Sequence, residues 1–159
     1  AGAAERPPGV EVSLFAVCDG TRHALLPLAV QEQGGGGPAG AMGALAPSPA
    51  ADAGLLARAE REAVVPVLDG LREEGRPFAG CLLLRMVLTP EGPVVTALGC
   101  CLGDLVAQAA LPLLDCDLFS VLLACADCRL SGNPLKVRPR MSAVAVVMAS
   151  GGYPGPFQT

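Results

Sequence analysis

The distribution of apolar and polar positions predicts a β-hairpin near the start of the chain. Val10–Cys18 (VEVSLFAVC) is apolar and rich in β-branched residues, and Asp19-Gly20 directly after it is typical of a turn. We expect His23–Val30 (HALLPLAV) to be the returning strand. Pro27 should lie at its edge or end, because proline cannot donate a hydrogen bond to a strand ladder.

Similar patterning predicts a second hairpin and a final strand. Phe78–Thr89 and Pro93–Leu98 flank Pro90-Glu91-Gly92, which has the composition of a turn. Arg85 interrupts the first of these apolar runs, so we expect its side chain on an open face or at an edge. Ser142–Met148 (SAVAVVM) is predicted to be a last buried strand.

Helical spacing is clearest between Asp52 and Glu74. Asp52 can cap this helix, Pro66 should bend or restart it, and Gly75 is expected to end it. Two shorter apolar helices are expected at Asp104–Leu114 and Asp117–Ala126. In the long helix the apolar residues near helical spacing are Leu55, Leu56, Ala59, Ala63, Val67, Leu68 and Leu71.

Residues 30–51 are rich in glycine, proline and alanine, and we expect a loop there. The composition fits a flexible linker, and it also fits a substrate loop whose glycines let the backbone approach a ligand. The spacing matches neither the phosphate-binding pattern GxxxxGK[ST] nor the dinucleotide-binding pattern GxGxxG.

The composition is apolar and weakly charged. Of 159 residues, 52% are hydrophobic and 16% are charged, against a usual charged share of roughly a quarter. The chain either buries surface against partners or a missing part of itself, or it reflects an Ala- and Gly-rich genome. A net charge of −4 and a pI near 4.9 argue against nucleic-acid binding. Four Phe, one Tyr and no Trp offer little for base stacking.

The sequence gives no sign of a membrane span or a secretory leader. No uncharged apolar run reaches the length of about 18 residues that a spanning helix needs. The first residues, AGAAERPPGVEVS, lack the apolar core of a signal peptide. We therefore expect a soluble intracellular protein, in the cytoplasm or in an organelle such as the mitochondrion.

Seven cysteines form an odd set without the spacing of a disulfide framework. Most lie in apolar segments, where a free cysteine behaves as a small hydrophobic residue. Cys125-Ala-Asp-Cys128 is a CxxC pair, but a zinc site needs further ligands, and the single histidine, His23, is far away in sequence. Structural cysteines are therefore favoured over a metal or redox role.

Five segments of the chain, taken in order, carry a family resemblance. They are EVSLFAVCDG, GPAGAMGALAPSP, GCLLLRMVLTPEGPVV, LGDLVAQAALPLLDCDLFSVLLAC and VVMASGGYPG. Together they resemble phosphoribosylamine–glycine ligase, also called glycinamide ribonucleotide synthetase, an enzyme of purine synthesis. The family enzyme joins phosphoribosylamine to glycine at the expense of ATP. Its ATP-grasp fold holds nucleotide and magnesium between two α+β lobes.

The resemblance implies an α+β fold in which helices pack on the antiparallel sheet of an ATP-grasp-like second lobe. It covers Val10 to Gly155 but matches only the later part of the family enzyme. The implied organisation is a partial, degenerate ATP-grasp-like domain over residues 1–141, followed at 142–159 by the start of the family's C-terminal domain. The N-terminal substrate domain and most of the first nucleotide-binding lobe have no counterpart.

The positions that the resemblance marks as functional have lost their polar side chains. The family's Glu-Phe-Asn, whose Glu and Asn hold magnesium, matches Ala97-Leu98-Gly99, and the Arg that follows matches Cys101. Magnesium takes oxygen ligands, and neither an alanine nor a glycine side chain supplies one. Gly103-Asp104 is kept, but the Pro-Glu that follows it in the family is replaced by Leu105-Val106.

A glycine loop is the other candidate for a residual ligand site. The family's Gly-Pro-Asn-Thr-Gly-Gly-Met-Gly resembles residues 37–43 (GPAGAMG), with one residue lost and the Asn and Thr groups gone. The candidate residues that remain are Gly37, Pro38, Gly40, Met42 and Gly43, together with Gly103 and Asp104.

Three functions fit these observations, and whether the chain is an enzyme stays open among them. The first is a degenerate, non-catalytic relative that serves as a structural or interaction subunit of a larger assembly, with other protein subunits as partners and no cofactor or metal. The alternative is a fragment of an active ATP- and Mg-dependent ligase whose remaining parts lie on another chain. The third is a domain that binds a nucleotide or phosphoribosyl compound through Gly34–Gly43 without catalysis. Losing one preorganised polar group costs on the order of 10²–10³ in rate, which favours the first function.

Overall fold

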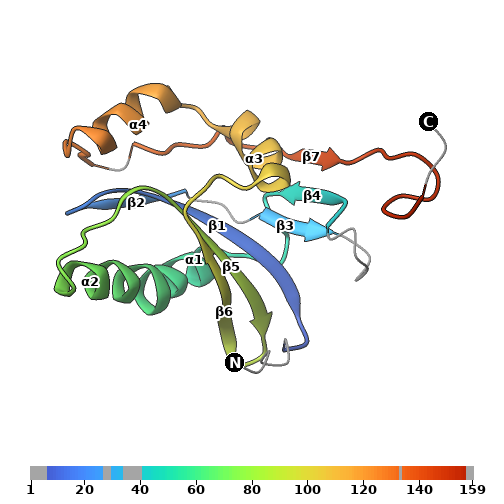
Figure 1. Cartoon of the computed structure of the whole chain (residues 1–159), viewed down its shortest axis with the longest axis horizontal. Coiled ribbons are helices and arrows are strands. Elements are labelled where there is room, and N and C mark those ends of the chain that lie inside the picture. Colours follow the sequence, from blue (N-terminus) through green and yellow to red (C-terminus); the bar gives the residue numbers. More distant parts are fainter. Residues whose placement is uncertain (1–6, 27–29, 34–40, 133, 157–159) are drawn as a thin grey trace.

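The computed structural model describes residues 7–26, 30–33, 41–132 and 134–156. These residues form a seven-stranded antiparallel sheet with the order β6-β5-β1-β3-β4-β7, and β2 pairs with one end of β1. One helical layer covers each face of the sheet (Figure 1). The strands are β1 (Val10–Asp19), β2 (His23–Leu25), β3 (Val30–Gln33), β4 (Gly43–Ala46), β5 (Ala79–Thr89), β6 (Gly92–Gly99) and β7 (Ala143–Val146).

The helices divide into two groups along the chain. One face carries α1 (Ala53–Ala59), the π-helical turn η1 (Glu60–Val64) and α2 (Val65–Glu73) as one continuous rod. The other face carries α3 (Asp104–Ala110), the 3₁₀ turn η2 (Leu111–Leu113) and α4 (Leu118–Ala126). In the described part of the chain no helix combines the length and the hydropathy that crossing a bilayer would require.

The first hairpin is confirmed, but its second strand is shorter than predicted. β2 pairs antiparallel with β1 and ends at Leu25, with Cys18 opposite His23. Val30 begins a separate strand, β3, which pairs with β1 nearer its start through Ser13. Residues 27–29, including Pro27, lie outside the described residues.

The loop predicted over residues 30–51 is wrong in part, because two strands lie within it. β3 pairs with β4, and β4 pairs with β7. Ala44 and Ala46 of β4 are fully buried in the cluster that includes α3, and their small side chains let the helix lie close to the strand. Residues 34–40 lie outside the described part of the chain.

The long helix begins and ends where the sequence predicts. The Asp52 carboxylate accepts a hydrogen bond from the Leu55 amide at 2.7 Å, which caps α1. Gly75 follows the helix with φ at +72°, a conformation that favours glycine. α2 begins at Val65, directly after the π-helical turn, and Pro66 lies in its first turn, so the helix restarts at the proline as predicted.

The second hairpin and the two apolar helices are also confirmed. β5 and β6 pair antiparallel, and Thr96 is an extra, bulged residue between the pairs Met86–Val95 and Arg85–Ala97. The Asp117 carboxylate caps α4 by accepting from the Phe119 amide at 3.2 Å. The last strand is confirmed as β7, at the edge of the same sheet, but the prediction that it is buried is wrong, because only Ala145 of β7 is buried. A domain boundary at residues 141–142 stays a prediction.

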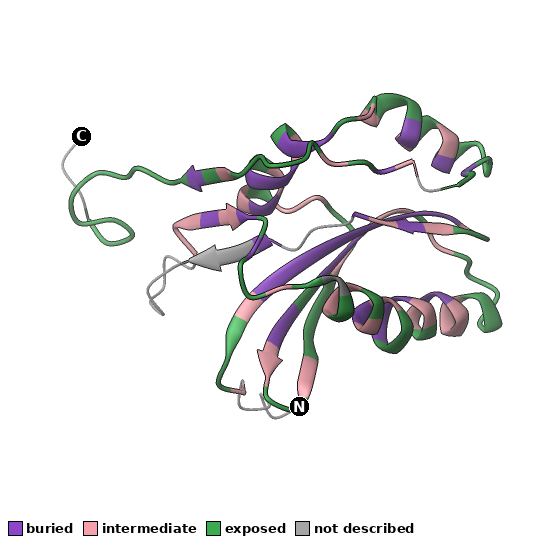
Figure 2. Ribbon diagram, turned by 180° about the vertical axis from the view of Figure 1, so that it is seen from behind, coloured by how far each residue is buried: buried purple, intermediate pink, exposed green. Residues whose placement is uncertain are grey.

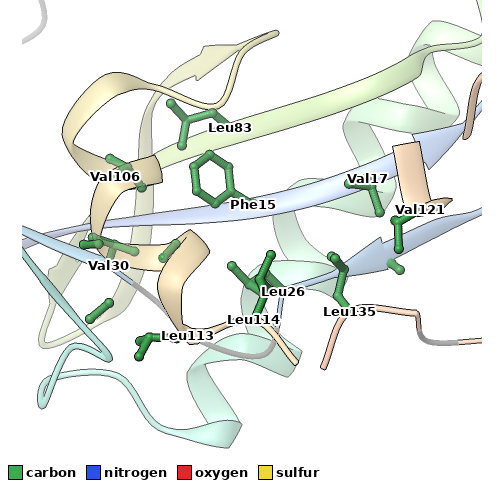
Figure 3. Close-up of a cluster of buried hydrophobic side chains, with 14 of the residues drawn as sticks. Phe15, Val17, Leu26, Val30, Leu83, Val106, Leu113, Leu114, Val121 and Leu135 are labelled. Carbon is green, nitrogen blue, oxygen red and sulfur yellow. The ribbon is translucent and has the colours of Figure 1, made fainter. Parts of the chain in front are cut away.

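Two cores stabilise the sheet, one on each face. β1 contributes to both, since its successive side chains alternate between faces, and it is buried along most of its length (Figure 2). Phe15, Leu83 and Val106 point toward one another between the sheet and α3 (Figure 3). On the opposite face the rod packs on the neighbouring positions of β1 and β5, with Leu14, Ala16, Ala59, Val64, Leu82, Leu84 and Met86 among the buried residues.

A buried carboxylate ties the first hairpin to the segment after α4. Asp19 is fully buried, and its Oδ1 accepts from the Thr21 amide and hydroxyl at 2.9 Å each and from the Arg22 amide at 2.6 Å. Its Oδ2 accepts from the Leu130 amide at 3.0 Å, while the Arg22 guanidinium donates to the Leu130 carbonyl at 2.7 Å. Burial raises the pKa of Asp19, but these hydrogen bonds outweigh it and lower the pKa to about 2.

Candidate functional site

The candidate metal positions lie at the carboxyl end of β6, the edge strand beside β5. Ala97 is opposite Arg85, and Gly99, the last residue of the strand, is opposite Leu83. Residues directly opposite in an antiparallel pair share a face, so Ala97 and Gly99 both face the α3 side of the sheet, where Leu83 packs. The structure therefore places these two positions on one face of the sheet.

Four residues lie opposite one another on successive strands at the level of Ala97, and one of them is a cation. From β6 inward they are Ala97, Arg85 on β5, the buried Ser13 on β1 and Val30 on β3. The Arg85 side chain is exposed, which agrees with the predicted open position. A guanidinium has no acceptor atom, so Arg85 itself cannot serve as a metal ligand. Sequence patterning did not find this juxtaposition, because it depends on the bulge at Thr96.

The turn between β6 and α3 carries the remaining family positions. Cys101 is exposed, and its Sγ lies 3.6 Å from the point where a Cβ on Gly99 would stand. Gly103 has φ at +63°, and its carbonyl accepts from the Ala107 amide at 2.9 Å, so it starts α3. Asp104 is exposed in the first turn and accepts from Gln108 Nε2 at 2.6 Å. Gly103-Asp104 therefore builds the start of the helix.

The glycine loop is separated from these positions in the sheet. Met42 directly precedes β4, and Gly43 begins it, with β3, β1 and β5 between that strand and β6. At about 4.8 Å per strand, Gly43 and Ala97 lie on strands roughly 19 Å apart. Gly37, Pro38 and Gly40 lie outside the described residues.

The side chains present do not fit a magnesium ion at Ala97 and Gly99. A methyl group and a hydrogen stand where two oxygen ligands are required. Among the described residues, no three His, Cys, Asp or Glu side chains gather closely enough to hold a metal ion.

Two thiols packed into the sheet, Cys81 and Cys18, are poor nucleophiles. Burial raises the pKa of Cys81 to about 11, with contributions from the neighbouring Cys101 and Cys125. Burial raises the pKa of Cys18 to about 12, with contributions from Cys125, Cys81 and Asp19. Raised pKa values of this kind are typical of structural cysteines, which is the role that the sequence favours.

Comparison with known proteins identifies the family of the chain. Residues 4–107 match the family model of the phosphoribosylglycinamide synthetase ATP-grasp (A) domain. The chain belongs to the phosphoribosylglycinamide synthetase family. It is 39% identical over 160 residues to phosphoribosylamine–glycine ligase of Rhodopirellula baltica and 39% identical over 154 residues to the bifunctional purine biosynthetic protein ADE1 of Schizosaccharomyces pombe. These alignments cover 97% and 94% of the chain.

A solved member of the phosphoribosylglycinamide synthetase family has the same fold. The crystal structure of phosphoribosylamine–glycine ligase from Thermotoga maritima superposes with a TM-score of 0.77 and 27% identity over 95% of the chain. The α+β, ATP-grasp fold that the sequence predicts is therefore confirmed. The chain spans 36% of the Rhodopirellula ligase, 19% of the Schizosaccharomyces protein and 39% of the Thermotoga structure.

Proposed function

We propose that this chain is a degenerate, non-catalytic member of its purine-biosynthetic family and serves as a structural or interaction subunit of a larger assembly. The observation that carries the proposal is the environment at the end of β6. Ala97 and Gly99 offer no oxygen ligand, and the side chain directly opposite Ala97 is the cation Arg85. Phosphoryl transfer depends on metal and cationic groups that neutralise developing charge, so loss of the metal positions removes its main source of rate.

The scaffold around the lost ligands supports a loss of chemistry rather than a loss of fold. Gly103 keeps the turn into α3, and the core at Leu83, Phe15 and Val106 is closed beneath it. A Cβ on Gly99 would meet Cys101 Sγ at 3.6 Å and Leu83 Cβ at 3.8 Å, which are ordinary contacts. Packing at the Cβ position therefore does not require a glycine at residue 99.

The alternative is a fragment of an active ATP- and Mg-dependent phosphoribosylamine–glycine ligase whose remaining parts lie on another chain. The observation in its favour is coverage, since the chain spans only 36% of the Rhodopirellula ligase. Under this alternative the second chain must supply the magnesium ligands, because Ala97 and Gly99 cannot.

Calorimetry with MgATP, followed by a ligase assay with phosphoribosylamine and glycine, tests the proposal. We expect neither Mg²⁺-dependent ATP binding nor turnover from the chain alone. Turnover that depends on Mg²⁺ would refute the non-catalytic role, and ATP binding without turnover would favour a ligand-binding domain instead.

A double variant that restores the ligands, together with a matched control, tests metal binding directly. Ala97→Glu with Gly99→Asn returns two oxygen ligands to the α3 face of β6, and we expect it to raise affinity for Mn²⁺, a paramagnetic substitute for Mg²⁺ whose binding is read from water proton relaxation. Val95→Glu with Leu98→Asn places the same groups on the opposite face of the strand and serves as the control. Equal Mn²⁺ binding by both double variants would show that the site on the α3 face is not preserved.

A further inference from the structure

Cys81 and Cys101 belong to neighbouring segments at the end of the β5–β6 hairpin. Cys81 is on β5, and Cys101 is in the turn that follows β6. The last pair of this ladder joins Leu83 to Gly99. Because the strands are antiparallel, the position two residues beyond this pair holds Cys81 on β5 and Cys101 on the other segment. The chain bends at Cys100 and Cys101, so Cys101 leaves the ladder at the position that would face Cys81.

The Cys101 thiol lies over the face of the sheet that carries Cys81. Its Sγ is 3.6 Å from the point where a Cβ on Gly99 would stand, and the Leu83 Cβ is 3.8 Å from the same point. Cys81 is two residues from Leu83 on β5, and alternate residues of a strand share a face. Cys81 is half-buried and packs against the core between the sheet and α3. Both thiols are therefore on the α3 side of the sheet.

The two segments approach each other as closely as a disulfide needs. The separation of 3.8 Å between the Leu83 Cβ and the Cβ position of Gly99 equals the usual Cβ–Cβ separation in a disulfide. The next position along the hairpin is that of Cys81 and Cys101. Electrostatic coupling agrees with this placement, because after burial itself Cys101 makes the largest contribution to the raised pKa of Cys81, ahead of Cys125. Such coupling falls with distance.

The other cysteines close to this position are poorer partners for Cys101. Cys100 is its neighbour in sequence, and consecutive Cα atoms are about 3.8 Å apart, which is less than the roughly 4.4–6.8 Å that a disulfide usually spans. Cys125, on α4, is 2% exposed and couples to Cys81 less strongly than Cys101 does. The geometry therefore favours Cys81 as the partner of Cys101.

We propose that Cys81 and Cys101 are an oxidisable pair, which a low-molecular-weight disulfide such as glutathione disulfide converts to a disulfide bond that ties the turn between β6 and α3 to β5. The bond forms within this chain, so it needs no part of the longer relatives. The inference is also independent of whether the ligase chemistry is lost. The turn that the bond fixes contains Gly99 and Cys101, two of the positions that the family resemblance marks as functional.

Two exchange steps form the bond and conserve atoms and electrons. The exposed Cys101, as a thiolate, attacks one sulfur of glutathione disulfide, which gives a mixed disulfide and releases one glutathione. The Cys81 thiolate then attacks the Cys101 sulfur and releases the second glutathione. Two protein thiols are oxidised, and one glutathione disulfide is reduced to two thiols that take up the two protons. Because burial raises the pKa of Cys81 to about 11, the second step should accelerate as the pH rises above neutrality.

Treatment with glutathione disulfide at about pH 8.5, followed by mass spectrometry, tests the pairing. The protein used has Cys100 and Cys128, the other exposed cysteines, changed to serine. We expect the product to lose two hydrogen atoms and to carry no glutathione, with peptide mapping joining Cys81 to Cys101. A glutathione that stays on Cys101, a disulfide from Cys101 to Cys125, or an unmodified chain would each overturn the proposal.

Two alanine variants of that protein form a matched test of the partner thiol. Cys81→Ala should keep one glutathione on Cys101, because no thiol remains to displace it. Cys125→Ala should still form the disulfide. Circular dichroism checks that both variants are folded, and the peptide mapping of the parent protein needs neither of them. The same product from both alanine variants would overturn the assignment of Cys81.

The bond should also raise the thermal stability of the chain. A disulfide restricts the unfolded state, and this one closes a loop that contains all of β6. We expect the oxidised protein to have a Tm about 6–12 °C above that of the same protein reduced with dithiothreitol. Cys101→Ser, treated in the same two ways, is the control and should show one Tm. A Tm that does not rise on oxidation would show that the two thiols are not placed for a bond.

Discussion

Replacing Asp19 by asparagine removes a buried charge while keeping the size and shape of the side chain. The carboxylate accepts four hydrogen bonds, three at Oδ1 from Thr21 and Arg22 and one at Oδ2 from the Leu130 amide. An amide group has one oxygen and one NH₂. Whichever way it is turned, the NH₂ faces a backbone N–H that previously had an acceptor.

The expected cost follows from these four contacts. A buried donor left without a partner costs about 1–3 kcal/mol. The contacts that remain lose their charge assistance, which is roughly half of their strength. We expect Asp19→Asn to lower the free energy of unfolding by about 3 kcal/mol. For a chain of 159 residues this corresponds to a fall of about 6–12 °C in Tm.

The effect should depend on pH in a defined direction. The pKa of Asp19 is about 2 in the folded state against an ordinary value of 3.8. A carboxyl whose pKa is lowered by folding stabilises the native state above its unfolded pKa, and this stabilisation is lost as the pH falls through its folded pKa. The difference between wild type and Asp19→Asn should therefore be constant above about pH 5 and should shrink between about pH 4 and pH 2.

Urea unfolding followed by far-ultraviolet circular dichroism measures the difference at each pH. Asp69→Asn is the control, because Asp69 pairs with Arg72 on the surface and exposed ion pairs contribute less than about 1 kcal/mol. If Asp19→Asn lost no more free energy of unfolding than the control at pH 7, the Asp19 hydrogen bonds would not be a major source of stability. A loss that stayed the same at every pH would refute the role of the charge.

Two further predictions concern the turn into α3 and the thiols. Gly103→Ala should lower stability by about 1–2 kcal/mol, because φ is +63° and the new Cβ would stand 3.0 Å from Leu83 Cδ2. Gly70→Ala, in a helix with open space, should instead raise it by about 0.5–1 kcal/mol, and equal effects in urea unfolding would contradict this account. In the folded protein a disulfide thiol reagent should modify three of seven cysteines rapidly, and fast reaction of Cys18 would contradict its pKa of about 12. The three exposed thiols are Cys100, Cys101 and Cys128.

The long strands were predictable because their local sequence signals agree with the pairing that the sheet imposes on them. Val10–Cys18 and Phe78–Thr89 combine β-branched and apolar residues with turn residues directly after them, and the structure places β1 and β5 within one residue of those bounds. The π-helical turn at Glu60–Val64 was not predicted, since a search for helical spacing assumes a constant period of 3.6 residues.

β3 and β4 could not be predicted because their sequences lack strand signals. Gly43–Ala46 (GALA) has neither β-branched nor aromatic residues, and its glycine and alanines are depleted in strands generally. Pairing with β3 and β7 on its two edges makes it a strand, while Ala44 and Ala46 are buried by contacts that include α3. These are contacts between distant segments, which composition does not report.

The candidate site was located by family resemblance, and its electrostatic surroundings came only with the structure. Uninterrupted pairing from Met86 and Val95 would place Arg85 opposite Thr96. The bulge shifts the register by one residue and places Arg85 opposite Ala97 instead. No pattern of apolar and polar residues reveals a single-residue bulge, so the cation opposite the candidate position Ala97 could not be predicted.

The π-helical turn before Pro66 keeps the helical segments on both sides of it facing the sheet. The Val65 amide donates to the Glu60 carbonyl, five residues back, so Ala59 and Val64 are both fully buried against the sheet. In a regular α-helix, positions five apart differ by about 140° around the axis, and one of the two would face solvent. Without the turn, Pro66 would lie inside a regular α-helix, where its ring clashes with the carbonyl four residues back. The π-helical turn therefore keeps Ala59 and Val64 on the same side of the rod and also provides a helix start for the proline.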